Sequence, residues 1–284
     1  MRQLRKLNSG FKKPCKELTG VCFAVIILIL LNNSVIAQGS FGARAFSLGG
    51  STAALTQSGG WSLFHNPALL KTDLPGVSFY TMRFAGLEEI TDMAAVALFR
   101  TRVGTAAAGA HRYGFELFQR TRLSTGLSRS AGRIYYGVNI SLHHIAQGGG
   151  YGSASAVGVD AGVAAEIIPQ LLLGSRITNV NRPTYGRGEE ELPMEMAVGL
   201  LYNASNEFNL TADLVKDVRF PVSFRSGAEL NLSDTLLARA GISARPNIWS
   251  AGLGYLAESY SFNLAIQRHE FLGISPAVDF TVRL

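Results

Sequence analysis

Five histidines are the residues of this chain with the widest chemical range, because an imidazole can act as a base or bind a metal ion. They are His65, His111, His143, His144 and His269. No Gly-x-Ser-x-Gly elbow, His-Glu-x-x-His helix or phosphate-binding glycine loop accompanies them. His143 and His144 are adjacent, and on a strand they cannot bind one metal ion together, since neighbouring side chains point to opposite faces. The sequence therefore predicts no catalytic residue, no metal site and no cofactor, and a protein that is not an enzyme.

Five charged residues in the last third of the chain have a spacing suited to ion pairs. They are Arg225, Glu229, Arg239, Asp279 and Arg283. On a strand, residues an even number of positions apart share a face. We expect these side chains to form a polar ladder of inward-facing ion pairs that holds a segment inside a barrel. A path for solutes along the same side chains is the alternative.

The segments that carry these charges alternate apolar and polar side chains with a period of two, which is typical of strands with two unlike faces. Residues 222–232 illustrate the pattern. One face carries Val222, Phe224, Ala228, Leu230 and Leu232, and the other carries Arg225, Gly227, Glu229 and Asn231. Turn signals divide residues 76–284 into about fourteen such segments, most of them near the roughly 9 to 11 residues that a tilted membrane strand needs.

The polar faces carry isolated charges among Gly, Ser and Asn, and aromatic residues gather at strand ends on the apolar faces. Both features favour a membrane barrel over a sandwich or a propeller. Backbone amides in hydrocarbon must all be paired, so a sheet in a membrane has no open edge. We therefore predict an all-β fold, a closed antiparallel transmembrane β-barrel of about 14 strands over residues 76–284. A soluble exported β-protein is the alternative.

Connection lengths predict which end of the barrel faces outward. The links after even-numbered strands are short, whereas several links after odd-numbered strands, at 147–152, 180–192 and 268–274, are longer. Short links on the periplasmic side and long links outside are the outer-membrane pattern.

The first 37 residues have the composition of a secretory signal peptide. Basic residues precede an apolar run at 21–31, and Val35-Ile36-Ala37 follows as a cleavage site. The run is too short for a membrane-spanning helix, which needs roughly 20 apolar residues. Cleavage after Ala37 removes both cysteines and most of the net positive charge. The mature chain is therefore predicted to have no disulfide and no nucleic-acid partner.

Residues 38–75 lie between the leader and the first predicted strand. A barrel of about fourteen strands is too wide for its own side chains to fill. We expect this glycine- and alanine-rich segment to fold into the lumen as a plug. Gly49 and Gly50 supply backbone freedom there. Pro67 fixes its own φ and biases Asn66 away from helix, so a rigid turn at Asn66, Pro67 and Ala68 is favoured over a ligand contact.

The passage "GARAFSLGGSTAAL", followed by "SLFHNPALL", resembles the amino-terminal hatch signature of the FadL superfamily of outer-membrane barrels. Within that superfamily the chain most resembles the PorV/PorQ family, whose members are associated with type IX secretion in bacteria of the Bacteroidetes type. Later segments agree in their order, among them "ITNVNRP", "LPMEMAVGLLYN", "FNLTADLVKD" and "FLGISPAVDFTVRL". The resemblance covers residues 39–284, and Asn66-Pro67-Ala68 matches the hatch motif. Leu284 departs from the family's terminal phenylalanine.

The resemblance implies a plugged, non-enzymatic outer-membrane protein that acts in type IX protein secretion or surface attachment, with secretion-system proteins as partners. The alternative is a FadL-like transporter of small hydrophobic molecules, in which the plug shifts to open a sideways route. A continuous apolar pocket between plug and wall, with a kink in the wall, would favour that alternative. In both cases the expected location is the bacterial outer membrane, with outer-membrane lipid and the barrel-assembly machinery as partners.

Overall fold

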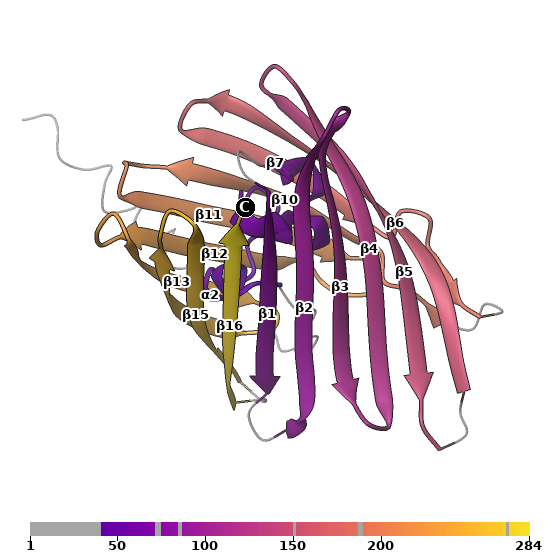
Figure 1. Ribbon diagram of the computed structural model, residues 1–284. Helices are drawn as coiled ribbons and strands as arrows, with labels where there is room; N and C mark the ends of the chain where they lie inside the picture. Colours follow the sequence, from indigo (N-terminus) through magenta and orange to yellow (C-terminus); the bar gives the residue numbers. More distant parts are fainter. Residues whose placement is uncertain (1–40, 72–74, 85–86, 150–151, 187–189, 271–272) are drawn as a thin grey trace, which may run out of the picture.

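The computed structural model describes residues 41–71, 75–84, 87–149, 152–186, 190–270 and 273–284. The predicted signal peptide, residues 1–37, lies outside this part of the chain. Figure 1 shows a barrel wall of long strands with short helical elements behind β1 and β2.

Fourteen strands form one closed antiparallel barrel, as predicted. Each strand of the wall pairs with the next one along the chain, and β16 closes the ring by pairing with β1. The wall consists of β1 (Gly76–Phe84), β2 (Leu87–Thr101), β3 (Gly104–Phe115), β4 (Phe118–Ala131), β5 (Ile134–Gln147), β6 (Gly152–Ile168), β7 (Leu171–Thr178), β10 (Glu195–Asn203), β11 (Phe208–Asp217), β12 (Ser223–Asn231), β13 (Leu236–Ala244), β14 (Ile248–Leu256), β15 (Tyr260–His269) and β16 (Gly273–Arg283). A separate small hairpin, β8 (Thr184–Tyr185) and β9 (Glu190–Glu191), lies in the link between β7 and β10.

The two faces of the wall have opposite character. On β5, Val138 and Ile140 are each 53% exposed, whereas their neighbours Asn139 and Ser141 are completely buried. β12 repeats the pattern, with Leu230 exposed and Glu229 buried. The apolar side chains therefore cover the outside of the barrel and the polar ones face its interior, the reverse of a water-soluble domain.

Residues 41–71, which we call the inner segment, fill the middle of the barrel. They include the short helix α2 (Ala43–Ser47) and the 3-10 elements η1 (Ser58–Phe64) and η2 (Pro67–Leu69). α2 contacts β13 to β16, η1 contacts β1 to β4, and η2 contacts β4 to β6. The inner segment therefore touches the wall around most of its circumference.

An apolar core joins the inner segment to one side of the wall. From the inner segment it contains Phe46, Trp61, Leu63 and Phe64, and from the wall it contains Tyr80, Met82, Val96 and Leu98. Trp61 is 2% exposed and stacks edge-on against Tyr80, with ring centroids 6.0 Å apart. The other tryptophan, Trp249, lies on the outer face and is 59% exposed. The chain has only these two tryptophans, so their fluorescence can report separately on the interior and the outside.

A belt of inward-facing glycines lets the inner segment approach the wall closely. At each of these positions an added Cβ would lie within 3.0 Å of an atom of the inner segment. The glycine belt consists of Gly109, Gly126, Gly137, Gly162, Gly174, Gly227, Gly241 and Gly252. At Gly174, for example, the Cβ would be 2.0 Å from the carbonyl oxygen of Ala53, which no real contact allows. Glycine is required there for space.

We call the end of the barrel at which β1 begins the proximal end, and the opposite end the distal end. β2 to β6 have 12 to 17 residues, whereas β7 and β10 to β15 have 8 to 10. The wall is therefore longer on the side of β2 to β6, as Figure 1 shows.

The distal links agree with the expected pattern in part. Residues 179–194 form a long link, as predicted. The prediction of a long link at 268–274 is wrong, because β15 and β16 stay paired as far as His269 and Gly273 and only residues 270–272 connect them. Among the described residues, no helix is long and apolar enough to span a membrane.

The glycine belt predicts that Gly174→Val destabilises the protein. The added side chain collides with Ala53, and such overpacking costs about 1 to 3 kcal/mol. Urea unfolding in detergent, followed by the emission of Trp61 in a Trp249→Phe background, measures the loss. Ser175→Val is the matched control, because it places the same side chain one residue away on the outer face. Equal unfolding midpoints for the two variants would contradict the assignment.

Candidate functional site

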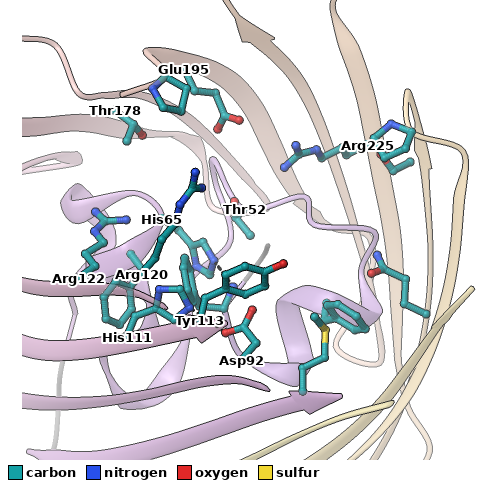
Figure 2. Close-up of a pocket in the computed structure, with 18 of the residues that line it drawn as sticks. Thr52, His65, Asp92, His111, Tyr113, Arg120, Arg122, Thr178, Glu195 and Arg225 are labelled. Atoms are coloured by element: carbon teal, nitrogen blue, oxygen red, sulfur yellow. Dashed lines mark hydrogen bonds and ion pairs between the residues drawn. The ribbon is translucent and has the colours of Figure 1, made fainter. Parts of the chain in front are cut away.

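A cavity of about 330 Å³ lies at the distal end, between the inner segment and the wall. Its lining comes from the ends of β1, β3, β5, β7, β13 and β15, the starts of β2, β4, β10, β12, β14 and β16, the links after β7 and β13, and the inner segment. Figure 2 shows the side chains that project into it. The barrel contributes alternate residues of many strands, so the sides of the cavity differ in chemistry.

One side of the cavity is aromatic. The ring of Phe41 lies 4.9 Å from that of Phe64 and packs edge-on against His111 at 4.5 Å. Phe84 packs edge-on against Tyr113 at 5.9 Å. We call these five residues the aromatic wall. They present ring faces and edges of the kind that bind apolar or aromatic groups.

The same cavity contains several charged side chains. Arg122 bonds to Asp160 at 2.7 Å, and Arg176 bonds to Glu195. Asp92 contacts the Nε2 atom of His111 at 2.8 Å. These ions are matched by partners, which is what burial of a charge requires.

His65 of the inner segment also lines the cavity. Burial lowers the pKa of His65 well below its usual range, and the nearby cations Arg176 and Arg122 act in the same direction. The ring is therefore neutral near pH 7, and its Nε2 atom accepts the backbone N–H of Phe41 at 2.9 Å. This hydrogen bond occupies Nε2 of His65 and holds Phe41 of the aromatic wall in place.

Three residues of the predicted polar ladder lie together. Glu229 accepts the Nε–H of Arg239 at 2.5 Å, and it also accepts two bonds at 2.8 Å from Arg44 of the inner segment. Asn263 accepts from Arg239 at 2.8 Å and donates to Asp279 at 2.6 Å. We call these five residues the lumen network. Because Arg44 is part of it, the network joins α2 to β12, β13, β15 and β16.

The other two predicted members lie elsewhere. Arg225 lines the cavity and donates to the carbonyl oxygen of Gly50 at 3.3 Å. Arg283 donates to the carbonyl oxygens of Ala257 and Glu258 in the turn at the proximal end. All five face inward, but they occupy three different heights, so they do not form one ladder.

Asn66, Pro67 and Ala68 form a buried turn against the wall. The side-chain nitrogen of Asn66 donates to the carbonyl oxygen of Ala53 at 2.6 Å, and its oxygen accepts the N–H of Ala68 at 3.1 Å. Ser128 of β4 donates to the carbonyl oxygen of Ala68 at 3.0 Å. Asn66 has extended φ and ψ of −111° and 104°, as the following proline requires. These hydrogen bonds join the turn to the rest of the inner segment and to β4.

Gly49 and Gly50 have φ values of 68° and 75°, in the left-handed region. A Cβ at Gly49 would lie 2.4 Å from the carbonyl oxygen of Ile242. Both conformation and space therefore call for glycine at position 49.

Asp213 was not predicted as a site residue, although it holds the inner segment. Its two carboxylate oxygens accept the Ser51 hydroxyl at 2.9 Å and the N–H groups of Thr52 and Ala53 at 2.6 and 2.8 Å. Arg44 and Asn263 were missed in the same way. For Asp213 and Asn263, the sequence showed only that each lies at an inward-facing position of a predicted strand. Such a position does not reveal which residue of the inner segment it contacts, because that segment has no periodic pattern. No group of three or more His, Cys, Asp or Glu residues that could hold a metal ion occurs within the described ranges.

No family model and no curated protein matches this sequence. Solved structures do match its fold. The toluene transporter TbuX of Ralstonia pickettii has a TM-score of 0.70 at 13% identity, with 88% of this chain and 100% of that chain covered. The toluene transporter TodX of Pseudomonas putida has a TM-score of 0.64 at 14% identity, with 88% and 100% covered. A FadL homologue of Pseudomonas aeruginosa has a TM-score of 0.61 at 10% identity, with 88% and 99% covered.

These structures share the closed barrel described above, and the likeness extends over most of each chain. At such low identities it concerns the fold. The chain therefore has the fold of FadL-like barrels.

The lumen network predicts that Glu229→Gln destabilises the barrel by about 3 to 5 kcal/mol, because it leaves two buried guanidinium groups without their carboxylate. The unfolding midpoint of Trp61 emission, in the Trp249→Phe background, measures the effect. Glu258→Gln, in an exposed turn, is the matched control and should change the midpoint little. Adding Arg44→Met to Glu229→Gln should cost less than the sum of the single changes. Additive losses would show that Arg44 and Glu229 are not coupled.

Proposed function

We propose that this protein lies in the bacterial outer membrane and takes a small hydrophobic molecule into the distal cavity, with the inner segment acting as a plug. The observation that carries this proposal is the aromatic-walled cavity between the inner segment and the wall. The fold of the barrel, its outer surface and the attachment of the inner segment each add support.

The outer surface supports a membrane location. Apolar side chains halfway along the strands are more than half exposed, for example Val198, Leu214 and Leu253. In water such a continuous apolar surface would promote aggregation, whereas in a bilayer it faces lipid. Closure between β1 and β16 satisfies the backbone, as hydrocarbon demands.

Aromatic residues on the same face mark an edge of the apolar surface. Near the proximal end, the rings of Tyr255 and Tyr260 are 6.0 Å apart, and those of Tyr260 and Phe280 are 6.1 Å apart. Such rows are typical of the interface between lipid and water in outer-membrane barrels. These features argue against the soluble alternative.

The inner segment supports a plug rather than an open channel. It is attached through the lumen network on one side, through Asp213 on another, and through the turn at Asn66 on a third. Each attachment is made through a buried side chain, Glu229, Asp213 or Asn66, whose hydrogen bonds are costly to break without replacement. A ligand is therefore expected to enter from the distal end, where the cavity lies.

The cavity supports a small apolar ligand. Its volume of about 330 Å³ lies within the range of small-molecule sites. The solved barrels TbuX and TodX, which have the same fold, are described as toluene transporters. The β1–β2 ladder also shifts register between Arg83 and Phe84, next to the aromatic wall. A second register shift, between Glu166 and Ile168 in the β6–β7 ladder, lies at the proximal end, so the irregularity beside the cavity is the one at β1.

The transporter role is better supported than the PorV/PorQ-type secretion role expected from the resemblance. The transporter alternative called for a continuous apolar pocket between plug and wall. The cavity lies there and has an aromatic side, but charged side chains line it as well, so it meets that condition in part. A secretion role would need a docking surface for a protein, and most of the distal links that could supply one are short.

A membrane location predicts that the cost of a charge on the outer face depends on its depth. Leu253 and Trp249 lie on the same face of β14 and are 58% and 59% exposed. Leu253→Arg, halfway along the strand, should cost about 2 to 4 kcal/mol, whereas Trp249→Arg, at the distal rim, should cost about 0 to 1 kcal/mol. Unfolding from lipid vesicles, followed by circular dichroism, measures both. Equal losses would indicate that both side chains face water.

The aromatic wall predicts that Phe84→Ser weakens toluene binding to the purified protein about tenfold, because a buried apolar contact is replaced by a hydroxyl. Isothermal titration in detergent measures the affinity. Phe99→Ser is the matched control, since Phe99 faces outward and is 42% exposed. No saturable toluene binding by the unmodified protein, or equal effects of the two changes, would contradict the proposed function.

A further inference from the structure

We propose that Arg225 binds the carboxylate of a small aromatic acid in the distal cavity. This inference rests on the proposed function and names the ligand class of the same cavity. The proposed ligand differs from an uncharged hydrocarbon by one negative group, and Arg225 is the residue that recognises this group.

Arg225 is placed to meet a ligand. It lies on the inward face of β12, and Figure 2 shows its guanidinium group directed into the cavity, on the side where Glu195 and Thr52 lie. Among the described residues, its side chain makes one hydrogen bond, from Nη1 to the carbonyl oxygen of Gly50 at 3.3 Å. A guanidinium has five N–H donors, so most of its capacity is left for another partner.

The other cations of the cavity already have carboxylate partners. Arg122 bonds to Asp160, and Arg176 bonds to Glu195. Arg120 is half exposed and lies 3.8 Å from Glu190. Among the described residues, no carboxylate lies within 4.0 Å of Arg225. Arg225 is thus the cation of this cavity whose charge has no ion-pair partner in the described ranges.

The carboxylate opposite Arg225 in the sheet is committed elsewhere. Asp213 lies directly across from Arg225 in the β11–β12 ladder, and both residues face inward. Opposite charges directly across an antiparallel ladder attract each other and stabilise the sheet. Here both oxygens of Asp213 are taken by Ser51, Thr52 and Ala53 of the inner segment. The attachment of the plug therefore leaves Arg225 without the partner that its position on the sheet would give it.

The chemistry of the cavity defines the ligand. A guanidinium in a partly buried site binds a carboxylate through two parallel N–H···O bonds, which are stronger than neutral hydrogen bonds. The aromatic wall, in the same cavity, offers ring faces and edges to an aromatic body. A ligand with both parts satisfies the cation and the apolar surface together, whereas a hydrocarbon leaves the cation unpaired.

The test compares 3-phenylpropionate with its neutral amide, 3-phenylpropionamide, by isothermal titration of the full-length protein in detergent. We expect the unmodified protein to prefer the acid. Arg225→Met should weaken binding of the acid about 10- to 100-fold, because the bonds between the carboxylate and the guanidinium are lost. It should leave amide binding and Trp61 emission unchanged. Arg219→Met is the matched control, because Arg219 is exposed and lies outside the cavity lining.

The outcomes separate this inference from the proposed function. Equal affinity for acid and amide, or an unchanged acid affinity in Arg225→Met, would overturn the role of Arg225 while leaving apolar binding in place. Tighter binding of octanoate than of 3-phenylpropionate would overturn the aromatic part. If Arg225→Met loses both probes, Arg225→Lys decides, and a retained preference for the acid supports the proposal. Failure of the unmodified protein to bind any probe, toluene included, would overturn both proposals.

Discussion

Backbone pairing between the first and last strands is the interaction on which the rest of the structure depends. β1 and β16 stay in register from Gly76 and Arg283 to Met82 and Ala277, so the sheet has no open edge. In the proposed membrane setting an unpaired edge would be costly, because lipid offers no hydrogen bonds. Closure with fourteen strands creates a lumen that the inward side chains cannot fill. The inner segment is the consequence of that geometry.

The inner segment fits because the wall is adapted to it in two ways. The glycine belt allows backbone to approach backbone, and the inward polar side chains supply bonds to groups that have no helical or sheet partner. Asp213 accepts two backbone N–H groups from a stretch without regular structure, and Glu229 accepts Arg44 from α2. The distal cavity remains where the inner segment does not reach the wall. Its aromatic and cationic sides follow from which strand ends meet there.

The alternation of side chains predicted the wall closely, because a period of two is a local property of each strand. The alternating segment at 222–232, for example, forms the strand Ser223–Asn231. The alternation of inward and outward positions also predicted that Arg225, Glu229 and Arg283 face inward. It could not predict their height in the barrel, which depends on the stagger of neighbouring strands, so the expected ladder divides into separate groups. Arg44 and the attachment at Asp213 were beyond prediction, because the inner segment has no periodicity that orients its side chains.

The most direct measurement is quenching of the two tryptophans by lipids with brominated acyl chains, in single-tryptophan variants reconstituted into vesicles. The account predicts strong quenching of Trp249 in Trp61→Phe and little quenching of Trp61 in Trp249→Phe, because one ring faces lipid and the other lies inside a filled barrel. Absence of quenching at Trp249, or equal quenching at both positions, would contradict it.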